Sequence, residues 1–262
     1  GIDLSVVAIS LFKTVIMGQF TFRYGLPAPL AIALGLALGT AMGAMNGFLI
    51  SRLRLPPFIV TLGTWQILLA SNFIFSANET IRSQDIAANA PSLQFWGNAI
   101  QPGGVKVLYA VFLMIALVLV MAYVLRHTAW GRHVYAVGDD AEAAKLAGVQ
   151  TDRIILQVYA LAGLFCAIAG WVMIGRFGSV SPTASTGQLG NIQSITAVVI
   201  GGISLFGGRG SILGMFFGAL IVGVFEMGLR LVGTDPQWTF FLIGALIIFA
   251  VAVDQWIRKV AA

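Results

Sequence analysis

The chain has 262 residues, of which 58% are hydrophobic and only 10% are charged. An ordinary soluble domain is about 25% charged, so the composition argues against a soluble protein and is typical of an integral membrane protein. The 15 Lys and Arg outnumber the 10 Asp and Glu, but they are scattered, which fits the positive bias of cytoplasmic loops and not a nucleic-acid surface.

Eight apolar stretches are candidates for membrane-spanning helices, which need about 20 residues to cross the hydrocarbon core. They cover residues 4–20, 28–50, 57–76, 104–125, 154–174, 191–205, 211–231 and 237–257. We therefore expect an all-α, polytopic helical bundle in the membrane, forming a single domain over residues 1–262. The first and sixth stretches are short and interrupted by polar residues, which is the pattern of broken or re-entrant helices.

The Lys and Arg residues between the spans predict the orientation of the chain. Nine follow the even-numbered spans: Arg52, Arg54, Arg126, Arg132, Lys145, Arg153, Arg209, Arg258 and Lys259. Five lie on the other side: Arg23, Arg82, Lys106, Arg176 and Arg230. The larger set marks the cytoplasmic side, so we expect loop 126–153 and both ends of the chain in the cytoplasm and loop 76–103 outside.

Glycines recur at every fourth residue in two of the expected spans. The rows are Gly35, Gly39, Gly43 and Gly47 in the second span, and Gly214 and Gly218 in the seventh. Rows of small residues let helix backbones approach closely in lipid, so we interpret them as helix-packing surfaces. A role in a substrate path is the alternative.

Polar side chains within the spans are candidates for a transport path, because buried polar groups are costly in a membrane. The candidates are Asn46, Gln66, Asn72, Gln193 and Glu226. Lys13 also lies midway along the first span. Hydrogen bonding between helices is the alternative for each of them, and Glu226 has Arg230 four residues later as an ion-pair partner.

The most polar block of the chain is GRHVYAVGDDAEAAKLAGVQ, residues 131–150. Asp139 is expected to cap a short helix, Glu142 to complete a capping box, and Gly148 to supply the left-handed end. Such a helix is about 12 Å long. A helix this short is marginal alone in water, so we expect another surface to hold it.

No signature of catalysis is found in the sequence. The chain has no GxxxxGK phosphate-binding loop and no GxSxG elbow. His127 and His133 lack the spacing of metal ligands, and one cysteine cannot build a zinc site. We interpret the glycine-rich residues 207–210 as a tight cytoplasmic turn, and expect neither an enzyme nor a metal or cofactor bound by this chain.

Four motifs in order resemble the permeases of bacterial monosaccharide ABC importers of the ribose, xylose, arabinose, galactose and fructose type. They are GIDLSV at 1–6, PPFIVTLGT at 56–64, GRHVYAVGDDAEAAKLAGV at 131–149 and GGISLFGGRGSILG at 201–214. The resemblance covers essentially the whole chain. It implies the type II importer fold of about ten spans in the bacterial inner membrane, so a chain with eight spans is expected to be incomplete at its N-terminus.

The resemblance also implies partners and a mechanism. Such permeases pair with a second permease copy, bind a cytoplasmic ATPase that holds ATP and Mg²⁺, and receive sugar from a periplasmic binding protein. The sugar crosses by alternating access. The family's coupling helix matches residues 139–148, and the implied ATPase contacts are Asp139, Asp140, Glu142, Ala143, Ala144, Leu146 and Gly148, with Arg132 and Tyr135 fixing the approach.

The chain departs from the family pattern at Val7, Lys13 and Glu226. Val7 and Lys13 bear on the packing of the first span, and Glu226 stands where most relatives have Asn. The alternative function is an ion-coupled secondary transporter, which needs a buried acid, and Glu226 is the one candidate. An integral-membrane enzyme is a third alternative, but it lacks a cluster of reactive residues.

Overall fold

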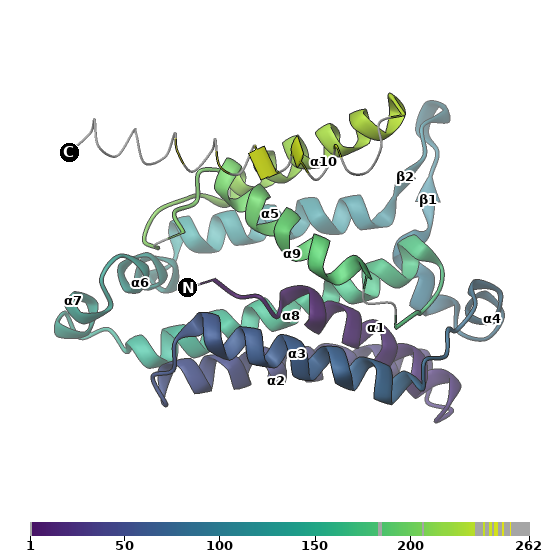
Figure 1. Ribbon diagram of the computed structural model, residues 1–262, viewed down its shortest axis with the longest axis horizontal. Helices are drawn as coiled ribbons and strands as arrows, with labels where there is room; N and C mark the ends of the chain where they lie inside the picture. Colours follow the sequence, from purple (N-terminus) through teal and green to yellow (C-terminus); the bar gives the residue numbers. More distant parts are fainter. Residues whose placement is uncertain are drawn as a thin grey trace. The chain divides into compact units, whose positions relative to one another are not determined.

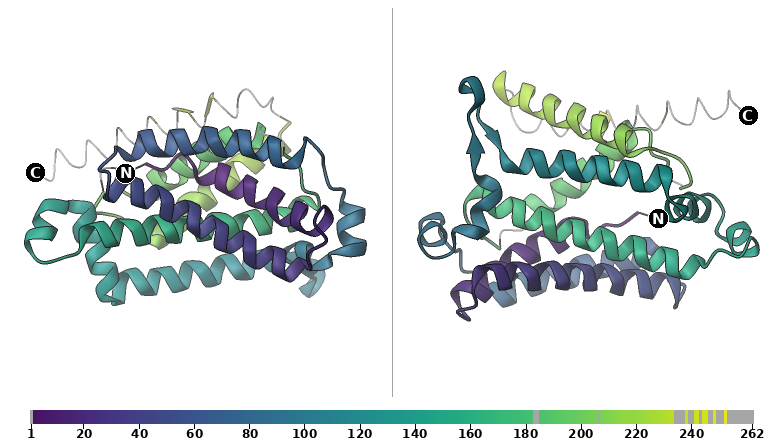
Figure 2. Two further views of the ribbon diagram at one scale, coloured as in Figure 1. Left: turned by 90° about the horizontal axis from the view of Figure 1, so that it is seen from below. Right: turned by 180° about the vertical axis from the view of Figure 1, so that it is seen from behind.

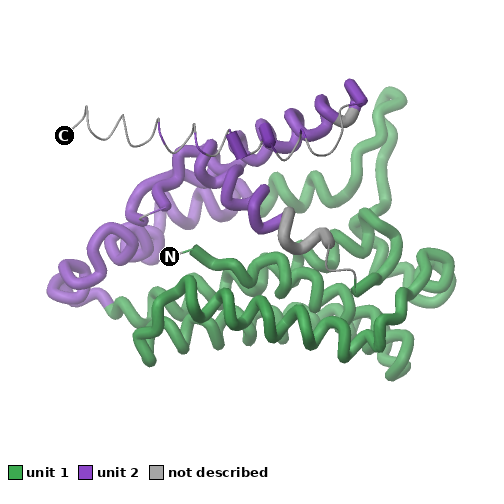
Figure 3. Tube along the Cα trace, in the orientation of Figure 1, with its two compact units in different colours: residues 1–117, 150–188 green, residues 118–149, 189–262 purple. Residues whose placement is uncertain are grey.

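The computed structural model describes residues 2–182, 185–205 and 207–233, together with isolated positions between 238 and 252; for residues 185–189 and Arg230 it describes only the backbone. The chain forms two compact units (Figure 3). Unit 1 contains residues 1–117 and 150–188, and unit 2 contains residues 118–149 and 189–262. Seven of the eight expected spans are helices, and the eighth, 237–257, falls outside the continuously described residues.

Four long helices make up the body of unit 1 and lie side by side in every view (Figures 1 and 2). They are α1 (Val6–Phe22), α2 (Ala28–Ser51), α3 (Pro57–Ser76) and α8 (Thr151–Phe177). Helices α2 and α3 begin with a proline in the first turn, whose fixed φ suits that position. The expectation of a broken first span is wrong, because α1 is continuous and buries twelve of its residues.

The expected outer loop 76–103 has its own structure, which the sequence did not predict. It contains α4 (Ser83–Asn89), η1 (Pro91–Gly97), β1 (Ala99–Ile100) and η2 (Pro102–Gly104), followed by β2 (Val107–Leu108). Strands β1 and β2 form a short antiparallel pair, so the chain is not entirely helical. Ile86 and Leu93 are fully buried against the helices of unit 1. Burying such a side chain contributes about 1.5–3 kcal/mol, so this segment is a packed part of the unit.

Unit 2 contains the second half of α5 (Tyr109–His127), then α6 (Ala129–Asp139), α7 (Ala141–Leu146), most of α9 (Ser185–Ile200) and α10 (Ile212–Leu231). Helix α9 is also one continuous helix, not a broken one. By length and composition α2, α3, α5, α8 and most of α10 can cross a membrane, and α1 and α9 are shorter apolar helices.

The glycine row of α2 lies at helix contacts. Gly39, Gly43 and Gly47 face α8, whereas Gly35 faces Met17 of α1. The partners on α8 are Leu156, Tyr159, Gly163 and Ala167. A Cβ atom built on Gly43 would meet a backbone carbonyl oxygen of α8 and would lie 2.9 Å from the nearest Cα there. Backbone atoms cannot turn aside as a side chain can, so this contact requires glycine.

Candidate functional site

The polar block begins with a turn from α5 into α6. Thr128 is the N-cap of α6, and its hydroxyl oxygen accepts a hydrogen bond from the backbone N–H of Gly131 at 3.1 Å. Gly131 is buried, and a Cβ built on it would meet the carbonyl oxygen of Leu125. The close packing of α6 on the end of α5 therefore depends on this glycine. Helix α6 was not predicted from the sequence.

The expected short helix exists as α7, but its cap is Asp140 and not Asp139. The Asp140 side chain accepts hydrogen bonds from the backbone N–H groups of Glu142 and Ala143, both at 2.9 Å. Asp139 is the last residue of α6. A cap residue must leave the helical conformation, and Asp140 does so with φ −146° and ψ 106°. Gly148 ends the turn at φ +87°, as predicted.

The surface of α7 carries an exposed hydrophobic side chain, Leu146, which is 91% exposed. Most of the residues expected to touch an ATPase are exposed with it: Arg132, Asp139, Asp140, Glu142, Ala143 and Gly148. Two are not. Ala144 is buried, and Tyr135 is half-buried with its hydroxyl group donating to the carbonyl oxygen of Gly210 at 2.9 Å. Both side chains pack within this chain, and the parts of Ala144 and Tyr135 in an ATPase contact stay predictions.

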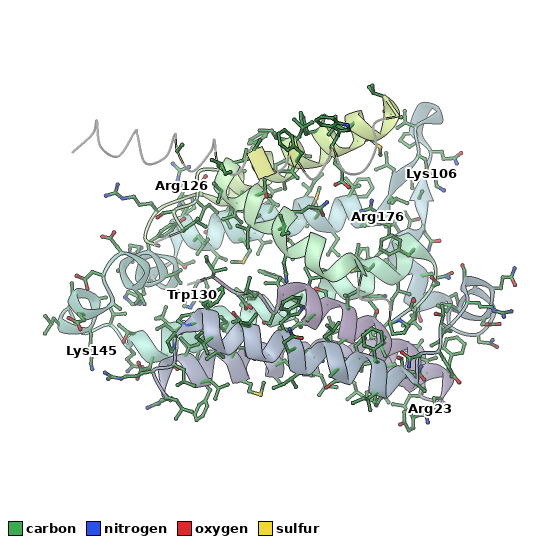
Figure 4. The ribbon with its side chains drawn as sticks, in the orientation of Figure 1. Arg23, Lys106, Arg126, Trp130, Lys145 and Arg176 are labelled. Carbon is green, nitrogen blue, oxygen red and sulfur yellow. The ribbon has the colours of Figure 1, made fainter. Side chains whose placement is uncertain are left out.

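Several basic side chains lie near the ends of helices. Figure 4 shows Arg126 and Lys145 at the same end of unit 2, with Trp130 near them. Within unit 1, Arg23, Lys106 and Arg176 lie toward one end. This arrangement agrees with the alternation of the two charge sets along the chain. Which end faces the cytoplasm stays a prediction.

Asn46, a candidate for the transport path, is fully buried in a hydrogen-bond network between helices. Its side-chain nitrogen donates to the Ser5 hydroxyl oxygen at 2.9 Å, and its side-chain oxygen accepts from the Thr64 hydroxyl at 2.7 Å. The network joins α2, α3 and the residue before α1. Both groups of the amide are thereby satisfied, as buried polar groups require.

Asn72 and Lys13 are among the residues of unit 1 that have a buried side-chain atom without a hydrogen-bond partner in the described part of the chain. The side-chain nitrogen of Asn72 donates to the carbonyl oxygen of Pro182 at 2.9 Å, but its side-chain oxygen has no partner among the described residues. Lys13 is 0% exposed, and in the described part of the chain its Nζ atom has no hydrogen-bond partner. That atom lies 4.8 Å from the ring centroid of Phe12.

The path candidates are divided between the two units. Asn46 and Asn72 are buried in unit 1, whereas Gln66 on α3 is exposed. Gln193 and Glu226 belong to unit 2 and bond to each other, with 2.9 Å between the amide nitrogen and a carboxylate oxygen. Among the residues that the structure describes, no three His, Cys, Asp or Glu side chains are grouped as metal ligands would be.

The family model that matches the chain is described as the branched-chain amino acid transport system permease component, and it matches residues 1–251. The relatives found among curated proteins are named for sugars. The fructose import permease protein FrcC of Rhizobium meliloti is 67% identical over 262 residues, which are 100% of this chain and 72% of that protein.

Two further relatives are more distant. The ribose import permease protein RbsC of Bacillus subtilis (strain 168) is 36% identical over 97% of this chain and 76% of that protein. The galactose/methyl galactoside import permease protein MglC of Escherichia coli (strain K12) is 33% identical over 88% of this chain and 68% of that protein. No solved structure matches the chain.

Proposed function

The chain belongs to the permeases of ATP-driven carbohydrate importers, and from this premise we propose that its substrate is fructose. The observation that supports fructose as the substrate is the identity of 67% with a fructose import permease over all 262 residues. The ribose and galactose relatives reach 36% and 33%. The family membership leaves no support for the alternative of an ion-coupled secondary transporter or for a membrane enzyme.

The proposed importer has three kinds of parts. Two copies of this chain form the translocation path, a cytoplasmic ATPase holds ATP and Mg²⁺, and a periplasmic binding protein delivers the sugar. The proposed pathway side chains are Asn46, Gln66, Asn72, Gln193 and Glu226. All but Gln66 already make a hydrogen bond within their own unit, and during transport we expect these bonds to be shared with, or exchanged for, contacts with sugar.

The α7 surface is the proposed dock for the ATPase on the cytoplasmic side. It consists of Arg132, Asp139, Asp140, Glu142, Ala143, Leu146 and Gly148. Leu146 is its apolar centre, exposed among charged neighbours. Exposing a large hydrophobic side chain to water is unfavourable, and burying it in a partner contributes about 1.5–3 kcal/mol. The docked ATPase would also hold a helix that is too short to be stable alone.

Uptake by the complete importer tests the sugar. The full chain, its ATPase and its binding protein are reconstituted in vesicles, and uptake of labelled fructose is measured against an excess of unlabelled fructose, ribose or galactose. We expect ATP-dependent uptake that unlabelled fructose suppresses and the other two sugars do not. Suppression by ribose or galactose at equal concentration would contradict the assignment of fructose.

Affinity of the ATPase for the membrane protein tests the dock. Leu146→Ser should weaken binding of the ATPase about 10- to 100-fold, because the apolar contact is lost. Leu53→Ser is the control, since Leu53 is also an exposed leucine, 55% exposed, but lies outside the α7 surface. Equal binding by the two variants would contradict the dock.

A further inference from the structure

The inward side of the α6–α7 segment is packed on the loop between α9 and α10, residues 201–211. A Cβ built on Gly208 would lie 2.7 Å from both Cα and Cβ of Asp139. A Cβ built on Gly138 would lie 2.8 Å from the backbone nitrogen of Gly208. Real Cβ atoms do not approach other atoms so closely, so the end of α6 and the loop meet through their backbones. The side-chain oxygen Oδ1 of Asp139 also lies 2.7 Å from the Cβ position built on Gly208.

A hydrogen bond fixes the same contact one turn earlier on α6. The Tyr135 hydroxyl donates to the carbonyl oxygen of Gly210 at 2.9 Å. The Tyr135 side chain therefore links α6 to the loop. Tyr135 lies three residues before Gly138, so both residues are on the same face of α6.

The loop that receives α6 is itself closed by backbone hydrogen bonds. The Ser204 N–H donates to the Arg209 carbonyl oxygen at 3.0 Å, and the Gly207 N–H donates to the Ser204 carbonyl oxygen at 3.2 Å. Gly207 and Gly208 have φ of +105° and +72°, a region that glycine adopts at little cost and other residues avoid. The loop is a defined turn, and its shape depends on glycine.

The two helices that the loop joins are packed as closely as the loop is on α6. A Cβ built on Gly218 of α10 would lie 2.6 Å from the backbone nitrogen of Gly201, just after α9. A Cβ built on Gly201 would lie 2.6 Å from the carbonyl oxygen of Gly214. Further along, Gln193 of α9 and Glu226 of α10 are hydrogen-bonded. The contact thus continues from the loop into the apolar part of both helices.

We propose that Tyr135, Gly138 and Gly208 are positioning residues that fasten the α6–α7 segment to α9 and α10, so that a displacement of α7 moves these two helices with it. The inference rests on the proposed function, because it takes the ATPase to act on α7. Close-packed interiors transmit displacement with little compliance. The compact unit that contains α6 and α7 also contains α10 and most of α9.

The segment that follows α7 differs from the close-packed contact that precedes it. Residues 147–150, which include Gly148 at φ +87°, are not helical and connect α7 to α8. Helix α8 belongs to the other compact unit. Loop 201–211 is therefore the close-packed attachment of the α6–α7 segment within its own unit.

Two alanine substitutions distinguish the effect of losing the close contact between α6 and the loop from the effect of backbone strain at a positive φ. Gly208→Ala and Gly202→Ala each place a side chain at nearly the same φ, +72° and +74°, but nothing lies within 4 Å of a Cβ at Gly202. In the reconstituted importer we expect Gly208→Ala to lower sugar uptake per ATP hydrolysed about fivefold or more, the penalty of overpacking. Gly202→Ala should lower it less, with ATPase binding unchanged in both. Equal coupling in the two variants would overturn the link.

Tyr135→Phe removes the hydrogen bond to Gly210 without adding volume, and so tests this link. Losing one hydrogen bond of about 1 kcal/mol should lower uptake per ATP about fivefold, while basal ATP hydrolysis and ATPase affinity stay unchanged. Tyr123→Phe is the control, because Tyr123 is 65% exposed on α5. A merely structural role of Tyr135 would instead lower the melting temperature and leave uptake per ATP unchanged, and that result would overturn the proposal.

Loss of uptake by the wild-type importer would refute the proposed function. The comparisons between variants are made in an importer whose wild type is active, so a failure of the link is distinguishable from a failure of the proposed function.

Discussion

The side-chain amide of Gln193 donates a hydrogen bond to the carboxylate of Glu226, across 2.9 Å and between α9 and α10. The sequence had offered Arg230 as the partner of this acid, but the side chain of Arg230 lies outside the described residues. A hydrogen bond within a protein typically contributes about 0.5–1.5 kcal/mol to stability. Glu226 therefore contributes to the contact between the two helices.

Glu226→Leu should destabilise the protein more than Glu226→Gln. The leucine removes an acceptor from the Gln193 amide, at a cost of about 1–3 kcal/mol, whereas the glutamine keeps an acceptor oxygen and should cost less than about 1 kcal/mol. Thermal unfolding in detergent measures both. Equal melting temperatures for the two variants would contradict a stabilising role of the hydrogen bond.

Gly43→Ala should lower the free energy of unfolding by about 1–3 kcal/mol or more, because the new methyl group meets the backbone of α8. Gly63→Ala in α3 is the matched control, since nothing lies within 4 Å of a Cβ there. Alanine is the better helix former, so the control should gain up to about 1 kcal/mol. The measurement is again thermal unfolding, and a loss of similar size in both variants would show that the α2–α8 contact is not the cause.

Asp140→Ala should destabilise α7 by about 0.5–2 kcal/mol, because two backbone N–H groups lose their acceptor. Hydrogen exchange of the amides of residues 141–148 should become faster. Asp139→Ala is the neighbouring control and should leave these amides protected, since Asp139 is not the cap. Faster exchange in the Asp139→Ala variant alone would show that Asp139 is the capping residue, as the sequence suggested.

Lys13→Met should raise the melting temperature. The substitution keeps most of the side-chain volume and removes a buried amine whose Nζ atom has no hydrogen-bond partner among the described residues. A buried polar group without a hydrogen bond costs about 1–3 kcal/mol, and an apolar group of similar size removes this cost. Lys13→Ala is the control for volume and should be less stable than Lys13→Met. A lower melting temperature for Lys13→Met than for the wild type would show that the amine makes a stabilising interaction in the membrane.

The spans were predictable because their signals are local. Long apolar runs bounded by Arg23, Arg52 or a first-turn proline fix the helix ends to within a few residues, as α2 and α3 show. The glycine row of α2 was equally visible, but its partner was not. Only the folded chain shows that α8, more than a hundred residues later, supplies the backbone that requires glycine there.

The details of the α7 surface depended on contacts that the sequence does not display. Asp139 and Asp140 are equivalent as capping residues in isolation. The choice falls on Asp140 because α6 extends through Asp139 to reach loop 201–211. Helix α6 had a usable start signal in Thr128, whose hydroxyl caps it, but its internal glycines weakened the helical pattern.

The near-complete enclosure of α1 has a consequence for biogenesis. Its neighbour α8 begins at Thr151, and at ribosomal rates of about 5–20 residues per second it emerges roughly 7–30 s after α1. During that interval Lys13 lacks its packing contact with α8 at Gly170. An uncompensated amine in the bilayer is unfavourable, so we expect the nascent α1 to stay in contact with other protein until α8 arrives. The enclosure of α1 is therefore completed only after α8 has emerged.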